Sequence, residues 1–277
     1  VFLLSGMHVH GGDETFTSSD ALSYHVPMHV LFVVLLLVFV FVERRIPQPF
    51  VDFRHFRHKY FTLSLVSNVA FHLSMLATMT LIPIMIEEGL GKSPIFVTAI
   101  LIPHQSFGIW LPAIAGSIHD KYSPKFLRTF CMISIAVGFV LLALFAGKVN
   151  FWMLPLLLLP ISFGTNVFNT VNNATVMSGL PTENRGFASG MLETTRDLGH
   201  ATGATLSTII LAMVLPAGIA FMVASESQGF YMKGFQTASL TVVGIMILGA
   251  IIAAFHRPYE PSKDRSVEQA SPAAADD

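Results

Sequence analysis

The chain has 277 residues, of which 53% are hydrophobic and 12% are charged, and its formal net charge is -1 at pH 7. A soluble domain carries about 25% charged residues, so this composition excludes an ordinary soluble fold and indicates a membrane protein. The nearly neutral charge gives no indication of nucleic acid as a partner, and we expect none.

Seven apolar runs occupy most of the chain, and each approaches or exceeds the ~20 residues that a helix needs to cross the hydrocarbon of a bilayer. In chain order they are 27–42, 61–86, 95–118, 126–146, 151–177, 188–215 and 235–255. A transmembrane barrel would alternate apolar and polar residues, whereas 30–42 is apolar almost without interruption. We therefore predict an all-α membrane protein with about seven spans, in which a six-helix bundle follows one further transmembrane helix.

The runs divide the chain into five predicted parts. These are the end of a preceding helix and an extracytoplasmic loop in 1–26, the additional transmembrane helix in 27–43, a basic cytoplasmic linker in 44–60, the six-helix bundle in 61–256, and a disordered cytoplasmic tail in 257–277. The outer loop contains His8, His10 and His25, but their spacing is not that of a metal motif. We therefore expect no metal and no cofactor.

The basic residues predict the orientation of the bundle. If successive runs alternate in direction, twelve of the sixteen Lys and Arg residues fall on one side of the membrane. These are Arg44, Arg45, Arg54, Arg57, Lys59, Lys121, Lys125, Arg128, Arg185, Arg257, Lys263 and Arg265. Basic loops face the cytoplasm and also contact anionic lipid. We therefore expect a multi-pass protein of the cell membrane. The start of the chain should lie outside the cell and the C-terminus in the cytoplasm.

The run 188–215 carries four ionisable residues within eight positions: Glu193, Arg196, Asp197 and His200. Spacings of three and four place them along one strip of a helix. Because an unpaired charge at bilayer depth costs at least ~2.5 kcal/mol on insertion scales, the strip must be paired or wetted. One interpretation is a charged lining that exchanges a proton or contacts substrate. The other is a local ion pair near the cytoplasmic headgroups.

A second polar strip lies in the run 151–177. Asn166, Asn169 and Asn173 recur there at spacings of three and four and share a face, with Asn172 on its flank. Carboxamides donate and accept hydrogen bonds, which suits either a polar substrate or contacts between helices. Further candidates for a substrate cavity are Asn68, His72, His104 and Gln105.

Small residues predict where helices pack closely. Gly186, Gly190, Gly199 and Gly203 form two pairs with a spacing of four. Such small-xxx-small pairs let the backbone of a neighbouring helix approach.

Enzymatic motifs are absent from the sequence. It contains no H-E-x-x-H zinc motif, no G-x-x-x-x-G-K-[ST] phosphate loop and no Gly-x-Ser-x-Gly elbow. We therefore predict that the chain is not an enzyme, and that uphill transport by it would depend on an ion gradient or another subunit.

The loop after the third run reads GSIHDKYSPK, from Gly116 to Lys125. It resembles the signature loop of the major facilitator superfamily, G-x-x-x-D-[RK]-x-x-x-[RK], which joins the second and third helices of each six-helix half. The resemblance implies a gating loop in which Gly116 allows close approach of helices and Asp120 meets a helix N-terminus or a basic partner. In the same loop Lys121 and Lys125 would anchor the cytoplasmic side.

Other segments resemble the fourteen-helix drug/proton antiporters of that superfamily. They are ERRIPQPFVDFRHFRHKYF, GKSPIFVTAILIPHQ, LPTENRGFASG and RDLGHATGA. The resemblance is to the C-terminal half plus one central helix, so it implies a major-facilitator-like six-helix bundle and a missing N-terminal half as its partner. The acids that usually couple to protons lie in that missing half. Here the resemblance implies Arg196 and Asp197 as a charge network, with Glu193 as a further candidate proton carrier.

The function implied is proton-coupled efflux of a small molecule by alternating access, with this chain as one wall of a central cavity. Two alternatives stay open. One is a seven-helix receptor, although no D-R-Y-like triplet ends the third helix and no N-P-x-x-Y occurs in the seventh. The other is a half-transporter that does not transport and acts as an interaction partner.

Overall fold

The computed structural model describes residues 19–46, 52–122, 126–216 and 218–255, and these ranges hold no β-strand. The long helices are α2 (Ser19–Glu43), α3 (Lys59–Ile84), α4 (Ile95–Tyr122), α5 (Leu127–Phe145), α6 (Leu154–Ser178), α7 (Arg185–Val214) and α8 (Ala224–Ala254). Short helical turns adjoin them: η1 (Phe53–Arg57), η2 (Met85–Gly89), η3 (Phe151–Met153), η4 (Thr182–Asn184) and η5 (Ile219–Phe221). The prediction of an all-α protein is confirmed.

Each predicted apolar run corresponds to one long helix. Within the described residues, five helical segments are long and apolar enough to cross a membrane: Lys59–Gly89, Ile95–Tyr122, Leu127–Phe145, Phe151–Ser178 and Ala224–Ala254. The other two long helices are not among these segments. The charged and threonine-rich sequence of α7 lowers its hydropathy, and the part of α2 whose side chains the structure describes forms a shorter apolar segment, Val30–Glu43.

Two helices begin well before the run that predicts them. α8 starts at Ala224 rather than near 235, and α2 starts at Ser19 rather than near 27. An apolar run marks the part of a helix that suits hydrocarbon. The helix itself continues beyond the run because backbone hydrogen bonds form equally well between polar residues.

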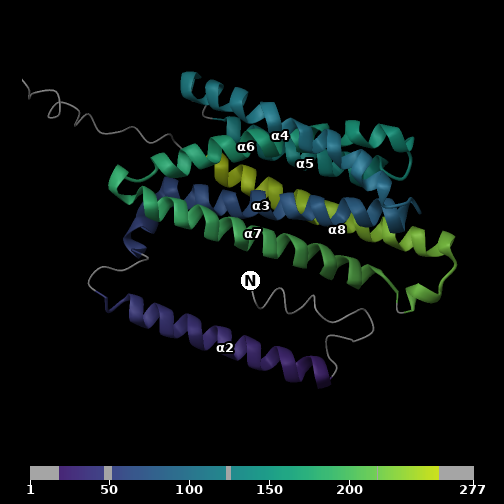
Figure 1. Ribbon diagram of the computed structural model, residues 1–277, viewed down its shortest axis with the longest axis horizontal. Coiled ribbons are helices and arrows are strands. Elements are labelled where there is room, and N and C mark those ends of the chain that lie inside the picture. The colour runs from purple at the N-terminus through teal and green to yellow at the C-terminus, as the bar shows by residue number, and fades with distance from the viewer. Residues whose placement is uncertain (1–18, 47–51, 123–125, 217, 256–277) are drawn as a thin grey trace, which may run out of the picture.

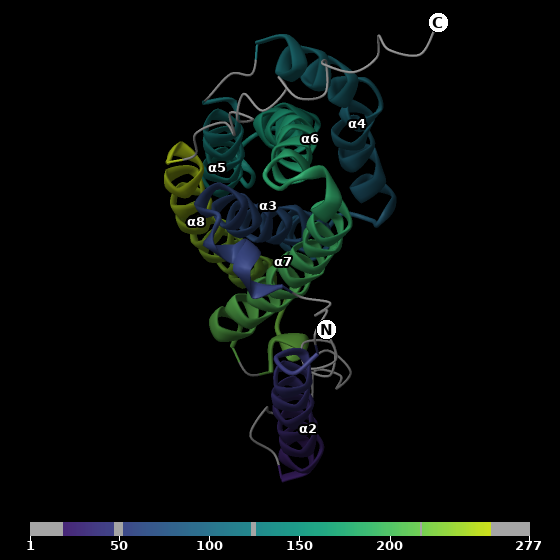
Figure 2. The same cartoon turned by 90° about the vertical axis from the view of Figure 1, so that its left-hand side faces the viewer.

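Six of the helices form a bundle, and α2 lies apart from it in both views (Figures 1 and 2). α3 runs through the bundle and packs against α6, α7 and α8, while α5 lies between α6 and α8. α4 packs mainly on α6, at the edge opposite α8 (Figure 2). The remaining side of the bundle, from α4 to α7, is formed by faces of α3 and α6.

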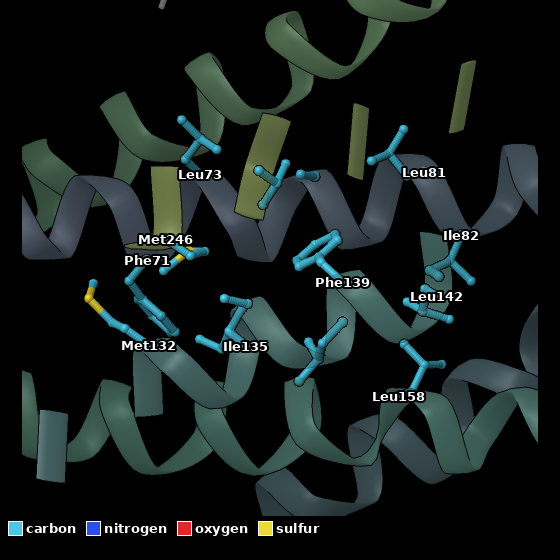
Figure 3. Close-up of a cluster of buried hydrophobic side chains, with 14 of the residues drawn as sticks. Phe71, Leu73, Leu81, Ile82, Met132, Ile135, Phe139, Leu142, Leu158 and Met246 are labelled. Atoms are coloured by element: carbon cyan, nitrogen blue, oxygen red, sulfur yellow. The ribbon is translucent and has the colours of Figure 1, made fainter. Parts of the chain in front are cut away.

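The core lies where α3, α5, α6 and α8 meet. Side chains exposed by no more than 1% and labelled in Figure 3 include Phe71, Ile82, Met132, Ile135, Phe139, Leu142, Leu158 and Met246. Lipid tails are as apolar as these side chains, so the helices are held together by close van der Waals packing rather than by transfer from water. Gly164 shows how close this packing is, since a Cβ there would lie 2.6 Å from the backbone oxygen of Cys131. A larger residue at 164 would force α6 away from α5.

The predicted linker 44–60 contains a docked element. η1 packs through Phe56 against Phe61 of α3 and Phe187 of α7, with ring centroids 6.2 and 6.1 Å apart. The Phe61 and Phe187 rings lie 6.0 Å from each other, and Thr62 Oγ1 donates a hydrogen bond of 2.7 Å to the backbone oxygen of Phe56. We call Phe56, Phe61 and Phe187 the aromatic cluster.

Some predictions fall on residues outside the described ranges. These are the end of a preceding helix, His8 and His10 in the outer loop, Lys125 of the gating loop, and the tail 257–277.

Candidate functional site

A chain of buried polar side chains joins four helices at the predicted cytoplasmic end of the bundle. Arg128 of α5 donates from Nη1 to Ser64 Oγ of α3 and to Asn172 Oδ1 of α6, both at 2.9 Å. Asn172 Nδ2 donates to Asn68 Oδ1 of α3 at 3.1 Å, and Asn68 Nδ2 donates to Thr195 Oγ1 of α7 at 2.9 Å. We call these five residues the buried network.

The buried network is almost completely removed from solvent and lipid. Arg128 is 4% exposed, and Asn68 and Asn172 are at most 1% exposed. Polar groups at this depth are stable only when they are hydrogen-bonded, and a fully satisfied network makes one arrangement of helices specific. Both amide groups here bond across helices. The buried network therefore fixes how α3, α5, α6 and α7 sit relative to one another.

The sequence contained a signal for Asn172 that the prediction did not use. Asn172 shares a helical face with Ile161, Thr165 and Phe168, and all four are buried. A polar residue on an otherwise packed face needs a partner from a neighbouring helix, whereas the prediction placed Asn172 on the flank of the strip of asparagines. Arg128 was grouped with the loop cations because it lies in the first turn of α5.

The three predicted asparagines of α6 share a different face. Asn166, Asn169 and Asn173 are all half-buried, in contrast to Asn172. Asn166 Nδ2 donates to the backbone oxygen of Ser162 at 2.8 Å, and Asn173 Nδ2 donates to Asn169 Oδ1 at 3.4 Å. These bonds stay within α6, so nothing in them indicates that the three residues join helices together. We call Asn166, Asn169 and Asn173 the amide face.

The amide face lies on the side of the bundle between α4 and α7. A Cβ on Gly108 of α4 would lie 3.1 Å from Asn166 Oδ1, which places this asparagine beside α4. α6 also contacts α7, on which Arg196 and His200 are half-buried as well. The two predicted strips of polar residues therefore lie on helices that contact each other.

The ionisable strip of α7 contains a local ion pair. Arg196 Nη1 lies 2.7 Å from Glu193 Oε2, with side chains 35% and 57% exposed, and Asp197 is exposed as well. The spacing of three along one helix suits such a pair. Glu193 and Arg196 thus satisfy each other, and the exposed Asp197 lies next to Arg196 in the helix.

His200 contacts His72 across the α3–α7 interface. His72 Nδ1 lies 3.1 Å from His200 Nε2, and the rings meet edge to face at 84° with centroids 4.9 Å apart. Two glycines bring the helices this close: a Cβ on Gly199 would lie 2.7 Å from His72 Cβ, and one on Gly203 would collide with the backbone oxygen of Leu73. The predicted close packing is confirmed for this glycine pair. Among the described residues, no heavy atom outside the local backbone of α7 lies within 4 Å of a Cβ built on Gly186 or Gly190.

The last two predicted cavity residues differ from each other. His104 is buried, with Nδ1 2.7 Å from Ser162 Oγ of α6. Because Ser162 Oγ donates its own proton to the backbone oxygen of Leu158 at 3.0 Å, it accepts from His104. Gln105 is exposed, and its Nε2 lies 3.6 Å from Met79 Sδ of α3. It lines a shallow groove of about 410 Å³ along one face of α4.

The predicted gating loop is wrong for most of its length, because Gly116, Asp120 and Lys121 lie in the last turns of helix α4, which continues to Tyr122. A Cβ on Gly116 would lie 3.8 Å from Thr170 Cγ2, which is an ordinary contact, so a small side chain would fit there. Asp120 is exposed, and Lys121 Nζ lies 5.2 Å from the ring of Tyr122. These residues lie at the end of α4 that precedes α5, whose first turn holds Arg128 of the buried network.

The comparison with known proteins identifies the family. Residues 17–204 match the family described as Major Facilitator Superfamily, and the chain belongs to that superfamily. It is similar to the riboflavin transporter RibZ of Clostridioides difficile, with 23% identity over 77% of this chain and 47% of the relative. It is similar to the multidrug efflux pump LfrA of Mycolicibacterium smegmatis, with 27% identity over 66% of this chain and 37% of the relative.

A third relative is the uncharacterized transporter YebQ of Escherichia coli, with 29% identity over 65% of this chain and 40% of the relative. The chain therefore spans less than half the length of these curated relatives. Membership of a transporter superfamily argues against the seven-helix receptor as the function of the chain.

Proposed function

We propose that this chain, as a member of the Major Facilitator Superfamily, forms the C-terminal half of a proton-coupled exporter of small molecules of the fourteen-helix type. In this proposal α3, α4, α6 and α7 supply one wall of a central cavity, and an N-terminal half supplies the opposite wall. The two halves rock around a site near the middle of the bilayer and expose it to each side in turn. In this arrangement the C-terminal end of α8 faces the cytoplasm.

The observation that carries the proposal is the amide face. Asn166, Asn169 and Asn173 are half-buried, and the hydrogen bonds described for them remain within α6. Amide groups that faced lipid would leave donors and acceptors unsatisfied at a cost of several kcal/mol. A wet cavity removes this cost and lets the same groups bind a polar solute.

The depth of the amide face also suits a transport site. α6 runs over Leu154–Ser178, so Asn166 is the central residue of this helix. At 1.5 Å per residue, it lies about 18 Å from either end. Substrates of transporters with two halves bind near this depth.

The relatives suggest which probes to use. One is named a riboflavin transporter and others are named quinolone resistance proteins or a multidrug efflux pump. Riboflavin and quinolones are planar heteroaromatic molecules with polar edges, and amides that both donate and accept can bind such edges. We propose small molecules of this class as the substrates.

The test is transport in everted membrane vesicles that contain the protein in its full-length cellular form. Riboflavin and a quinolone serve as probes, and a proton gradient is imposed across the membrane. We expect uptake that stops when the gradient is dissipated, and a loss of about tenfold in the Asn166→Ala, Asn169→Ala double variant. Thr237→Ala, on an exposed part of α8, is the control because it also removes a polar side chain from a spanning helix.

A protein that reaches the membrane and moves neither probe with or without a gradient would contradict the proposal. It would favour the half-transporter that acts as an interaction partner.

A further inference from the structure

The hydrogen bond between His72 and His200 requires one N–H and one lone pair. Neutral imidazole carries a single N–H, and which nitrogen holds it is assigned from the surroundings. His72 is 3% exposed, and its second nitrogen, Nε2, is buried without a hydrogen-bond partner among the residues that the structure describes. This atom decides between the two assignments.

If His200 donated to His72 Nδ1, the proton of His72 would lie on Nε2 as a buried N–H with no acceptor. Such orphaned donors are rare in folded proteins. If instead His72 Nδ1–H donates to His200 Nε2, then Nε2 of His72 holds only an unused lone pair. The second assignment is therefore the stable one for the neutral pair. It leaves a proton acceptor sealed inside the α3–α7 interface.

We propose that the His72–His200 pair is the proton-binding site of this half, and this inference rests on the proposed function. One proton from water binds to the lone pair of His72 Nε2, so the pair then holds three ring protons and one positive charge. In the described conformation the new N–H on Nε2 would have no acceptor, so the protonated pair belongs to a conformation in which the α3–α7 interface opens around His72 Nε2. Release returns the same proton to water, and no other bond changes.

The pair accepts one proton and not two. A second proton would have to occupy His200 Nε2, the atom that accepts the hydrogen bond at 3.1 Å. Two imidazolium ions at this distance repel strongly in a medium of low dielectric constant. The site therefore carries one elementary charge per cycle.

Charges of both signs lie beside the pair, since Arg196 is four residues and Asp197 three residues before His200. On α7, Glu193, Arg196 and Asp197 together carry a formal charge of -1, since the Arg196–Glu193 ion pair cancels itself. Asp197, three residues before His200, supplies the remaining negative charge on the same side of the helix.

The other helices packed against the pair bring little charge. α6 has no ionisable residue, α3 has only Lys59 and Tyr60 besides His72, and Arg128 of α5 belongs to the buried network. The ionisable residues of α8 are Glu226, Tyr231 and Lys233, within its first ten positions at the opposite end. A protonated pair thus neutralises the strip of α7.

Coupled transport requires a proton-binding atom that is closed to solvent in some conformations, and His72 Nε2 is buried in this one. A proton that could exchange freely in every conformation would leak without moving substrate. Here the acceptor atom is closed to solvent in this conformation, and Gly199 packs directly on the Cβ of His72. Exchange therefore takes place only in another conformation of the α3–α7 interface.

Nuclear magnetic resonance of the full chain in lipid nanodiscs, with ¹⁵N-labelled histidine, tests this site without any substrate. We expect a scalar coupling between His72 Nδ1 and His200 Nε2 across their hydrogen bond, and a joint response of both rings to the uptake of one proton. His104→Gln is the matched control because it removes another buried histidine and should leave both signals unchanged. Independent titration of the two rings, or no coupling between them, would overturn the proposal.

Transport in vesicles separates this inference from the proposed function. His72→Gln should abolish accumulation driven by a proton gradient while exchange of labelled for unlabelled probe continues at a rate within about threefold of the unmodified protein. If His72→Gln still accumulates the probe against its gradient, the proton site is wrong and the transport function stands. If the unmodified protein transports neither probe, the transport function fails, and the resonance experiment still decides whether the pair binds one proton.

Discussion

The buried network and the amide face differ in how completely their hydrogen bonds are satisfied, although both include residues of α6. In the buried network every bond described above that runs between side chains crosses from one helix to another. In the amide face the bonds remain within α6, and the side chains keep part of their surface free. Satisfied polar groups make a structure specific, whereas partly free groups at bilayer depth are available to a ligand. Asn172 and Asn173 are neighbours in sequence, yet Asn172 belongs to the buried network and Asn173 to the amide face.

Replacing Arg128 should have the largest effect on stability. Arg128→Met keeps the length of the side chain but removes two hydrogen bonds from a charged donor, and leaves Asn172 Oδ1 with no partner from α5. Bonds of this kind contribute about 1.5–3 kcal/mol each, so we expect a loss of about 3 kcal/mol. Thermal unfolding of the purified protein in detergent measures it. If the variant unfolds at the temperature of the unmodified protein but fails to transport, Arg128 has a role in transport rather than in stability.

The neighbours Asn172 and Asn173 give the sharpest form of the comparison. Asn172→Ala should destabilise the protein by about 1–2 kcal/mol, because Arg128 and Asn68 each lose a partner. Asn173→Ala should leave the unfolding temperature unchanged and raise the half-saturating probe concentration about fivefold, through loss of one hydrogen bond to substrate. Unfolding curves and transport kinetics of the two variants are measured side by side. The reverse pattern would show that Asn173 stabilises the bundle and that Asn172 binds substrate.

Neutralising the free carboxylate of α7 should affect coupling more than stability. We expect Asp197→Asn, and likewise Arg196→Gln, to reduce gradient-driven efflux about tenfold while the protein still reaches the membrane. The reason is that both changes alter the charge beside His200. Efflux from vesicles, normalised to the amount of protein, is the measurement. Unchanged efflux in both single variants would remove the ionisable strip from the mechanism.

Glu193→Gln should have the smallest effect. Its ion pair with Arg196 is a contact between side chains three residues apart on the same helix, and Glu193 is 57% exposed. Pairs of this kind stabilise a helix by about 0.2–0.5 kcal/mol. We expect efflux within about twofold of the unmodified protein. A much larger loss would show that Glu193 itself carries the proton.

The sequence predicted the helices better than it predicted their partners. Seven apolar runs gave seven helices because spanning a bilayer demands a minimum length of apolar residues. The common face of Asn166, Asn169 and Asn173 was also predictable, since it follows from the helical period alone. These features depend on one helix at a time.

The sequence could not predict which residues of different helices contact each other. Asn68 and Asn172 are 104 positions apart, and no period within either helix indicates that they bond. His72 and His200 were both candidates but were assigned to separate groups, because their contact depends on how Gly199 lets α7 approach α3. Arg128 was read as a loop cation because a count of charges at helix ends does not tell a buried guanidinium from an exposed one.

The aromatic cluster sets a limit on where α2 can be. Phe56 is held against Phe61 and Phe187, so the chain is anchored to the bundle at η1 rather than at the start of α3. Nine residues separate the end of α2 at Glu43 from the start of η1 at Phe53. Fully extended, they span about 30 Å. These nine residues therefore keep the C-terminal end of α2 within about 30 Å of η1, beside the interface of α3 and α7 that holds the two histidines.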